Sequence, residues 1–419
     1  MSQGHHPART AAHGSSGGRP RRTRWGRVLA ATVATALVAA AGAGFWVYRE
    51  LGDGLRTSEA LGSGAKSSGG EQNILLMGLD SRKDLQGDPL PKDLLDKLHA
   101  GASSDVGGYN TNTLILLHVP AGGGRATGIS VPRDDLVDVP GFGKRKIKEA
   151  YGLAKAREEE ALTRRGVTDH AELESRGREA GRRTEIATVR SFLGVPVDHF
   201  AEINLAGFYD LADALGGVDV CLKHATKDEY SGADFHAGHQ TLDAQQALAF
   251  VRQRHHLPAG DLDRTRRQQA FLLSALHKLE HSGLLDGIGR AHALLGAAKR
   301  DIVVDDGWGL LPMANELKEL AGGNVAFHTL PVDGFATYHR ESVNVVDPAK
   351  IRKEVAALLA PAAEPSPAPA NSSRKDRKDR KDRKDRKDRK DQKEHGAPGG
   401  GDDHKGGGLG DGDATACVD

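Results

Sequence analysis

The stretch NILLMGLD, residues 73–80, is a short apolar run that ends at Gly78, Leu79 and Asp80. Its hydrophobicity is continuous rather than alternating, which is typical of a strand that is covered on both faces. Four further runs share this character: TLILLHVP (113–120), ATGISVP (126–132), HFAEINL (199–205) and VDVCL (218–222). Together these runs predict a β-sheet that is mainly buried.

Helical patterns lie between and after these strands. They cover roughly residues 146–192 with some breaks, 206–215, 241–252, 263–280, 309–321 and 348–360, with one more strand near 325–331. Strands mixed with helices predict a layered α/β domain. We place this domain at residues 71–360.

The sequence before the domain predicts a membrane anchor. Residues 1–27 are polar, and five arginines in 19–27 directly precede an uncharged run at 28–48. A helix of this length would span about 30 Å, enough to cross a bilayer. The arginines keep the N-terminus in the cytoplasm by the positive-inside rule, so we expect the domain to be extracytoplasmic. A cleaved signal peptide is the alternative. Residues 49–70 read as a linker.

The sequence after the domain cannot form a core. Residues 361–373 are a Pro/Ala-rich linker, 374–391 repeat RKD six times, and a Gly-rich segment follows. We interpret 361–419 as a disordered, solvated tail, with adhesion to an anionic wall polymer as the alternative. The two cysteines, Cys221 and Cys417, allow at most one disulfide, and the default expectation is two free thiols.

The stretch ALAFVRQRHHLPAGDLDRTRRQQAFL, residues 247–272, encloses charge between apolar flanks. It holds five arginines and no lysine: Arg252, Arg254, Arg264, Arg266 and Arg267. Buried charge is costly without a partner, and guanidinium groups suit the recognition of phosphate. The stretch therefore indicates a phosphate or pyrophosphate site, and the alternative is a helix with solvated arginines.

Polar residues at the ends of three predicted strands strengthen this interpretation. They are residues 80–82 after the first strand, 110–113 at the start of the second and 133–135 after the third. Ligands of α/β sheets collect beyond strand ends, where loops meet. The formal net charge of +1 gives no general affinity for nucleic acid, and no predicted strand leads into a helix through a G-x-S-x-G nucleophile elbow.

Five blocks closely resemble the LytR-CpsA-Psr family, from about residue 73 to 280. They are NILLMGLDSR, NTNTLILLHV, ISVPRDDLVDVPGFGKRKIKEAYG, LAGFYDLADALGGVDVCL and the arginine-rich stretch. The resemblance implies an αβα domain with a mixed sheet that holds polyprenyl-pyrophosphate lipid in an apolar tunnel. It also implies a phosphotransferase-type enzyme of the cytoplasmic membrane. Such an enzyme moves a lipid-linked glycopolymer onto peptidoglycan, usually at the muramic acid 6-hydroxyl, and releases polyprenyl pyrophosphate or phosphate.

The resemblance also assigns site residues. The pyrophosphate-binding arginines of the family map onto Arg133, Arg252, Arg254 and Arg264, and the R-Q that follows maps onto Arg267 and Gln268. Prepositioned guanidiniums would stabilise the charge that develops on a pyrophosphate leaving group.

The family's metal and general base are less well defined in this sequence. The Mg²⁺ ligands map onto Asp80 and onto Asn112, where the family has a carboxylate. We therefore expect Mg²⁺ to bind more weakly here. Asp80, Asp134 and Asp261 are candidates for the general base, and we place Asp261 among the catalytic residues.

Two other functions stay open. A phosphatase acting on polyprenyl pyrophosphates would use the same arginines with water as the acceptor. A non-enzymatic wall-binding or regulatory membrane protein would not need them. Transcriptional regulation is disfavoured, because the only predicted cytoplasmic segment is residues 1–27 and contains no helix-turn-helix. The sequence does not say which glycopolymer is transferred.

Overall fold

The computed structural model describes residues 55–99, 101, 108–281, 288–309, 312–313, 316, 320, 325–360 and 416–419. All of these belong to one compact unit, Leu55–Asp419. The predicted membrane helix at 28–48 and the RKD repeats at 374–391 lie outside the described residues. Within the described ranges, none of the helices has both the length and the apolar character needed to cross a membrane.

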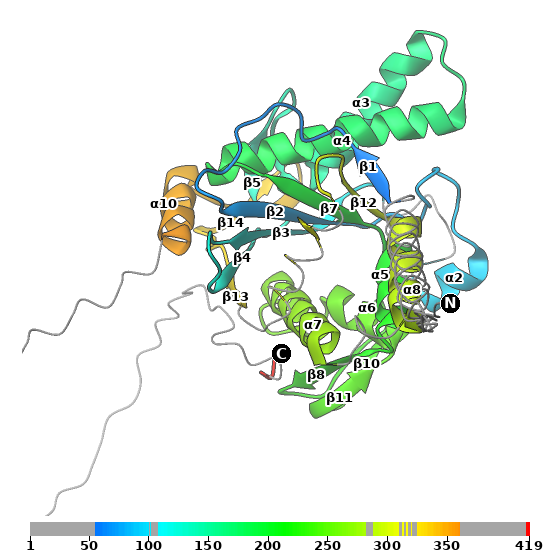
Figure 1. Cartoon of the computed structure of the whole chain (residues 1–419), viewed down its shortest axis with the longest axis vertical. Coiled ribbons are helices and arrows are strands. Elements are labelled where there is room, and N and C mark those ends of the chain that lie inside the picture. Colours follow the sequence, from blue (N-terminus) through cyan, green and yellow to red (C-terminus); the bar gives the residue numbers. More distant parts are fainter. Residues whose placement is uncertain are drawn as a thin grey trace, which may run out of the picture. The chain divides into compact units, whose positions relative to one another are not determined.

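A mixed seven-stranded sheet lies at the centre of this unit (Figure 1). In spatial order its strands are β1 (Arg56–Ser58), β12 (Ile302–Asp305), β7 (His199–Ile203), β2 (Gln72–Leu79), β3 (Thr111–Val119), β4 (Ala126–Ser130) and β13 (Val325–Thr329). β2 pairs antiparallel with β3 and parallel with β7, while β4 pairs parallel with β13. The predicted mixed, buried sheet is confirmed.

One face of the sheet is covered by α3 (Ala150–Arg164), α4 (His170–Leu193) and α10 (Pro348–Leu359) (Figure 1). Helix α4 begins where the Asp169 side chain accepts a hydrogen bond from the Glu172 backbone, and it ends at Gly194 with a φ of 74°. Its apolar side packs with the sheet in a core that includes Leu75, Leu116, Phe200, Ile186 and Val189.

The opposite face is covered by a second helical layer of α5 (Leu205–Ala214), α6 (Ala244–Arg252) and α7 (Asp261–His281), with α8 (Ile288–Asp301) beside α5 (Figure 1). Helix α6 begins with a capping box between Asp243 and Gln246. The rings of Phe208 on α5 and Phe271 on α7 lie 4.4 Å apart and tie two of these helices together. The fold is therefore αβα.

The described residues also form four two-stranded sheets and two short helices. They are β5 (Leu136–Val139) with β6 (Gly143–Lys146), β8 (Val218–Leu222) with β11 (Gly238–Leu242), β9 (Thr226–Asp228) with β10 (Ala233–Phe235), β14 (Gly334–Tyr338) with β15 (Glu341–Val345), α2 (Lys92–Lys97) and η1 (Ile147–Glu149). The predicted strand 218–222 exists as β8, but it pairs with β11 and lies outside the central sheet. β1 lies within the expected linker 49–70, so the folded unit begins earlier than predicted.

Cys221 and Cys417 form a disulfide, so the expectation of two free thiols is wrong. Residues beside the bond explain why the thiols meet. Val418 is 2% exposed within the core beneath β8, and its backbone exchanges hydrogen bonds of 3.0 and 2.8 Å with Cys221 and Lys223. Residues 417–419 therefore dock on β8, which no local pattern in the sequence indicated.

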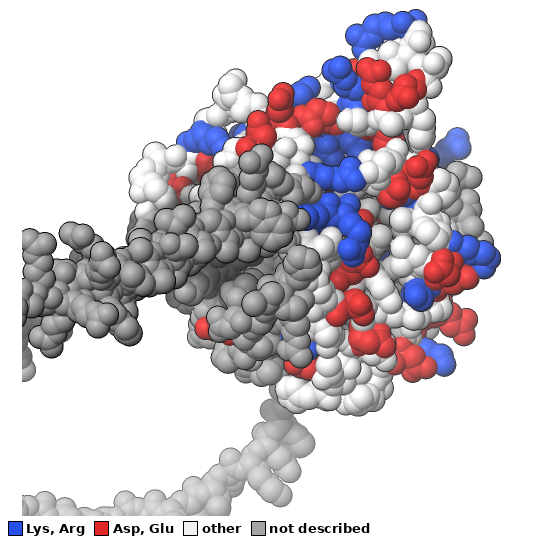
Figure 2. Space-filling model, turned by 45° about the vertical axis from the view of Figure 1, so that its right-hand side comes forward, with Lys and Arg blue, Asp and Glu red and all other residues white. Residues whose placement is uncertain are grey.

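The surface carries both signs of charge. On the face shown in Figure 2, the Lys and Arg side chains of the described residues are interspersed with Asp and Glu. This distribution agrees with the formal net charge of +1. On that face the described residues form no extended basic surface of the kind that binds nucleic acid through its phosphates.

Candidate functional site

A cavity of about 460 Å³ lies between the central sheet and helices α5, α6 and α7. Its apolar part is lined by Leu76, Ile115, Ala201, Ile203, Leu205, Phe208, Leu211, Leu248, Val251, Phe271, Leu272 and Ile302. Thr113 and Ile115 of β3 and Ala201 and Ile203 of β7 are alternate residues that line it, in keeping with the two-residue period of a strand. On β2, a side chain at Gly78 would place its Cβ 2.9 Å from Cβ of Thr113, so this position needs glycine.

Four arginines gather at one part of this cavity. Arg133 follows β4, Arg252 ends α6, Arg254 lies two residues further on, and Arg264 is in the first turn of α7. The side chains of Arg133 and Arg264 are 7% and 5% exposed, whereas that of Arg254 is 50% exposed. Three separate chain segments thus bring guanidiniums to the lining of one cavity, in positions that range from buried to half-exposed.

Asp261 faces three of these arginines. Its Oδ1 atom lies 3.3 Å from Nε of Arg133, 2.9 Å from Nη2 of Arg264 and 3.6 Å from Nε of Arg254. Burial lowers the pKa of Arg264 to about 10 although Asp261 opposes the shift, so this arginine remains a cation at neutral pH. Arg133 also lies 3.5 Å from Asp134, so two carboxylates face three guanidiniums. The remaining excess of positive charge favours an anionic ligand.

A guanidinium nitrogen of Arg264 is available for such a ligand. The Nε atom of Arg264 is buried and makes no hydrogen bond with any described residue, whereas Nε of Arg133 already lies 3.3 Å from Oδ1 of Asp261. Buried donors are normally paired, so Nε of Arg264 is expected to meet a ligand atom. Arg252 is oriented by its Nη1 atom, which donates to the Leu98 carbonyl at 2.6 Å, and burial lowers its pKa.

Asp80, Asn112 and Arg133 form a hydrogen-bonded chain on the cavity wall. Nδ2 of Asn112 donates to Oδ2 of Asp80 at 3.0 Å, and Nη1 of Arg133 donates to Oδ1 of Asn112. The remaining oxygen of Asp80, Oδ1, is buried and has no partner among the described residues. One free carboxylate oxygen is present for a cation, while the Asn112 carbonyl is already engaged. These residues therefore fit a weak Mg²⁺ site rather than a tight one.

Three residues are candidates for the general base. Asp80 lines the cavity, whereas Asp134 and Asp261 do not. Burial alone would raise the pKa of Asp134, but Arg133, Lys148 and Lys146 together hold it below its ordinary value. Nζ of Lys148 lies 2.7 Å from Oδ1 of Asp134. Asp261 contacts the arginines from outside the cavity lining.

Arg267 is separated from the predicted cluster, whereas Gln268 lines the cavity. Arg267 is fully buried; its Nη1 donates to Oε1 of Gln253 at 2.7 Å, and its Nε donates to the backbone oxygen of Asp419 at 2.6 Å. The structure therefore gives Arg267 protein partners in place of the predicted anion. Arg266 pairs with Asp263.

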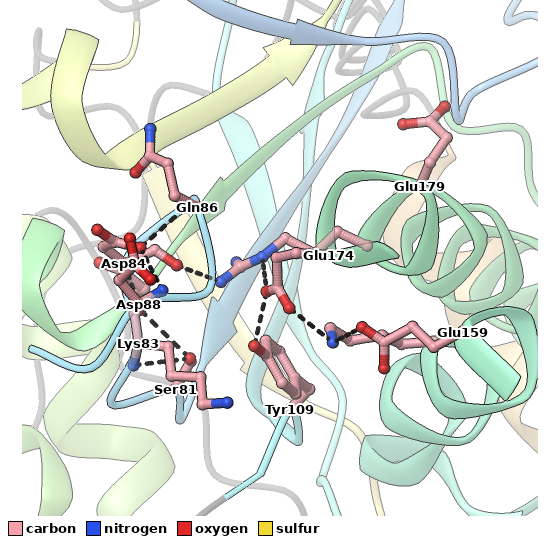
Figure 3. Close-up of polar contacts among 12 residues, drawn as sticks. Ser81, Lys83, Asp84, Gln86, Asp88, Tyr109, Glu159, Glu174 and Glu179 are labelled. Carbon is pink, nitrogen blue, oxygen red and sulfur yellow. Dashed lines mark hydrogen bonds and ion pairs between the residues drawn. The ribbon is translucent and has the colours of Figure 1, made fainter. Parts of the chain in front are cut away.

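A buried ionic network holds the two loops that carry Asp80 and Asn112. Figure 3 shows Glu174 and Tyr109 pointing toward each other beside the turn of Asp84. Glu174 accepts from the Tyr109 hydroxyl and from Nε of Arg178, both at 2.6 Å, and Nη2 of Arg178 donates to the Asp84 carbonyl at 2.6 Å. The loop after β2 and the segment before β3 are thus fixed to one helix, α4.

Sequence reasoning missed several residues of the cavity mouth. Tyr230 and His255 line the cavity, as do Asp228 and Ser231. The sequence around Tyr230, KDEYSG, has no motif that distinguishes it from a surface turn. His255 directly follows Arg254 in the sequence, and this adjacency is the one signal that could have indicated it.

The described residues contain one group of side chains close enough to share a metal: Cys221, His239 and Cys417. Both cysteines are in the disulfide, so neither supplies a thiolate. This group carries no metal site.

Known proteins resemble this chain over most of its length. The cell wall biosynthesis protein LcpA of Corynebacterium glutamicum is 39% identical over 356 residues, which cover 83% of this chain and 67% of LcpA. TagU of Oceanobacillus iheyensis, named as a polyisoprenyl-teichoic acid–peptidoglycan teichoic acid transferase, is 26% identical over 65% of this chain and 68% of TagU. This chain thus spans about two thirds of the length of these relatives.

The fold also matches a solved structure. The crystal structure of protein gbs0355 from Streptococcus agalactiae superposes with a TM-score of 0.50 at 20% identity, over 69% of this chain and 88% of that chain. The model of the LytR_cpsA_psr family matches residues 49–356, which include the sheet, the cavity and all four arginines. The chain therefore belongs to the LytR-CpsA-Psr family.

Proposed function

We propose that this protein transfers a glycopolymer from a polyprenyl-pyrophosphate carrier onto peptidoglycan. The observation that carries the proposal is the junction of an apolar cavity with four arginines, Arg133, Arg252, Arg254 and Arg264. A polyprenyl pyrophosphate has the same two parts in the same order. The family and the names of LcpA and TagU support this substrate class. The identity of the glycopolymer is left open.

The arginines would bind and polarise the pyrophosphate. In the transfer step, the acceptor hydroxyl oxygen forms a bond to the sugar-linked phosphorus. The bond from that phosphorus to the bridging oxygen breaks, and polyprenyl phosphate leaves. Charge grows on the leaving phosphate, where prepositioned guanidiniums stabilise it. Asp261 holds three of the guanidiniums in position.

We propose that Asp80 is the general base that takes the proton from the acceptor hydroxyl. Of the three acidic candidates, Asp80 lines the cavity and has a buried oxygen without a partner in the described part of the chain. A general base must reach the hydroxyl it deprotonates, so position decides against Asp134. Asp261 keeps a role in positioning, because its oxygen is surrounded by arginines.

Mg²⁺ binding is also a proposal. Oδ1 of Asp80 would hold the ion, with the Asn112 carbonyl as a second ligand if Arg133 released it. The same oxygen is the proposed general base, so it can take the acceptor proton only when no ion is bound to it. When bound, the ion would neutralise charge on the pyrophosphate. The roles given to the arginines do not depend on it.

We further propose that residues 28–48 anchor the protein in the cytoplasmic membrane with the catalytic domain outside. The uncharged run and the preceding arginines support this orientation. Protease treatment of intact cells and of lysed cells tests it. The domain should be cleaved in both, and protection of the domain in intact cells would contradict the proposal.

The test of function uses the full-length protein in detergent with a polyprenyl-pyrophosphoryl saccharide and peptidoglycan. Glycan attached to peptidoglycan and polyprenyl phosphate released are both measured. Arg252→Ala should lower the transfer rate about 10²- to 10³-fold, because a preorganised donor to the leaving group is lost. Arg164→Ala, which removes an exposed cation 67% accessible on α3, is the matched control and should leave the rate unchanged.

The alternatives give different outcomes. A phosphatase would release phosphate from the lipid without attaching glycan to peptidoglycan. A wall-binding or regulatory protein would retain its function in Arg133→Ala and Arg252→Ala variants. Either result would contradict the transferase.

A further inference from the structure

Tyr230 and His255 form an exposed aromatic pair at the mouth of the cavity. Their ring centroids lie 4.6 Å apart with an interplanar angle of 39°, and both residues line the cavity. Tyr230 is 78% exposed, which is unusual for a ring held against another ring. The pair therefore presents aromatic surface to whatever leaves the cavity.

The backbone beneath Tyr230 is rigidly held. Tyr230 lies in the turn between β9 and β10, and Asp228, which is 3% exposed, organises this turn. Its carboxylate accepts from the Tyr230 backbone at 3.0 Å and from the Ser231 hydroxyl at 2.9 Å, while its carbonyl accepts from Gly232 at 3.0 Å. An exposed ring on such a turn is presented in a fixed place.

The segment of His255 is tied to the same hairpin. Nε2 of Gln253 donates to the Thr226 hydroxyl at 2.6 Å and to the His255 carbonyl at 3.0 Å. The ring of His256 bonds to the Lys227 carbonyl at 2.9 Å, with a backbone φ of 62° that non-glycine residues rarely adopt. Strain of this kind persists where surrounding contacts fix it, and it is common at functional sites.

The pair adjoins the arginines rather than the lipid part of the cavity. His255 directly follows Arg254, and the negative charge of Asp228 acts on Arg252. A lipid-linked glycan is ordered as polyprenyl chain, pyrophosphate and sugar. With the chain among the apolar residues and the pyrophosphate at the arginines, we infer that the sugar lies beside Arg254, next to His255 and Tyr230.

We propose that Tyr230 and His255 are a binding platform for a pyranose ring, an inference that rests on the proposed function. A pyranose carries C–H bonds on its faces and hydroxyls at its rim. An aromatic face can pack against the C–H bonds, while the tyrosine hydroxyl and the imidazole nitrogens can form hydrogen bonds with the sugar hydroxyls. A polyprenyl chain has no such rim and would bury more surface inside the cavity. Both the first sugar of the donor and the muramic acid of the acceptor are pyranoses.

The test compares binding of two lipids to the full-length protein by calorimetry in detergent. The probes are undecaprenyl pyrophosphate and undecaprenyl-pyrophosphoryl-N-acetylglucosamine. Tyr230→Ala should weaken binding of the sugar-bearing lipid about 2- to 10-fold, the range expected for one aromatic contact, and leave the sugar-free lipid unchanged. Tyr230→Phe should retain most of the affinity. Phe335→Ala, at an exposed aromatic that does not line the cavity, is the control and should change neither.

A third probe, a soluble disaccharide containing muramic acid, separates the two sources of the sugar. A Tyr230→Ala effect on this probe but not on the lipids would assign the platform to the acceptor. Equal effects of Tyr230→Ala on both lipids, with none on the disaccharide, would overturn the platform. Failure of the wild-type protein to bind either lipid would overturn the proposed function instead. The disaccharide would then decide the platform, because absence of a Tyr230→Ala effect would exclude it.

Discussion

Asn112 determines how charge is arranged on the cavity wall. Its amide donates to Asp80 and accepts from Arg133, so it satisfies an anion and a cation at once. A carboxylate at this position could not donate to Asp80, and two adjacent carboxylates repel unless a cation lies between them. The amide thus holds the wall together without requiring a metal ion.

Asn112→Asp should therefore tighten Mg²⁺ binding about tenfold, a gain of about 1.4 kcal/mol. Titration of the full-length protein with MgCl₂ by calorimetry measures this without an activity assay. Gln240→Glu adds the same charge at a residue outside the cavity lining and should not change Mg²⁺ affinity. Unchanged Mg²⁺ affinity in Asn112→Asp would show that Asp80 and residue 112 do not share an ion.

Arg267 shows where residue-level prediction from the sequence ends. The charge enclosed in apolar sequence predicted Arg252, Arg254 and Arg264, the family resemblance added Arg133, and all four line one cavity. On a helix, however, Arg267 lies about 60° around the axis from Arg264. That rotation directs it toward Gln253 and residues 417–419. The docking of a segment about 150 residues away in sequence has no local signature, so the partner of Arg267 could not be predicted.

At the scale of elements, the length of a helix or strand decides whether it can be predicted from the sequence. β2 and β3, with eight and nine residues, and α4, with 24, carry patterns long enough to recognise. β1 and β12 have three and four residues and pair with each other across the fold. Their strand conformation comes from that pairing rather than from their own sequence, so they were missed. The layered α/β domain could be predicted because its long strands and helices could be recognised in the sequence.

The network around Glu174 makes α4 a support for the site loops. Glu174 and Arg178 are 2% and 1% exposed. Removing one partner of a buried ion pair leaves the other charge uncompensated, so Glu174→Gln should cost about 3 kcal/mol or more of unfolding free energy. Chemical denaturation measures this. Glu160→Gln breaks the exposed pair with Arg164 and should cost about 1 kcal/mol or less. Similar losses in the two variants would contradict a buried network.

A second acidic residue of α4 should make stability depend on pH. Glu185 is fully buried, and burial raises its pKa from 4.5 to about 8 although the Tyr151 backbone donates to its carboxyl group at 3.1 Å. The folded state therefore keeps a proton that the unfolded state releases above pH 4.5. Its contribution to stability is complete below pH 4.5, falls as the pH rises to about 8, and is absent above.

Glu185→Gln should remove this pH dependence. The amide cannot ionise, so its unfolding free energy should vary less than that of the wild type between pH 5 and 8, by an amount on the order of several kcal/mol at most. Denaturation series at several pH values measure the difference. Parallel curves for the two proteins would show that Glu185 is already ionised in the folded state.

At the scale of the whole molecule, the disulfide joins two regions that are 196 residues apart in sequence. It places Val418 in the core formed by α5, α6 and α7, and it brings the Asp419 carbonyl to Arg267. Arg267 in turn bonds to Gln253, which lies between Arg252 and Arg254. The far end of the chain is thus connected through two hydrogen bonds to the segment that carries the proposed pyrophosphate site.

Loss of the disulfide between Cys221 and Cys417 should destabilise the domain as a whole. Cys417→Ser should lower the unfolding free energy by about 2–5 kcal/mol, because the unfolded chain is no longer constrained. Urea denaturation with and without reductant measures the effect. Reductant should lower the stability of the wild type toward that of the variant and leave the variant itself unchanged. Because Arg267 then loses the Asp419 carbonyl, affinity for undecaprenyl pyrophosphate should fall in parallel. Wild-type stability that does not respond to reductant would show that the thiols are not joined in solution.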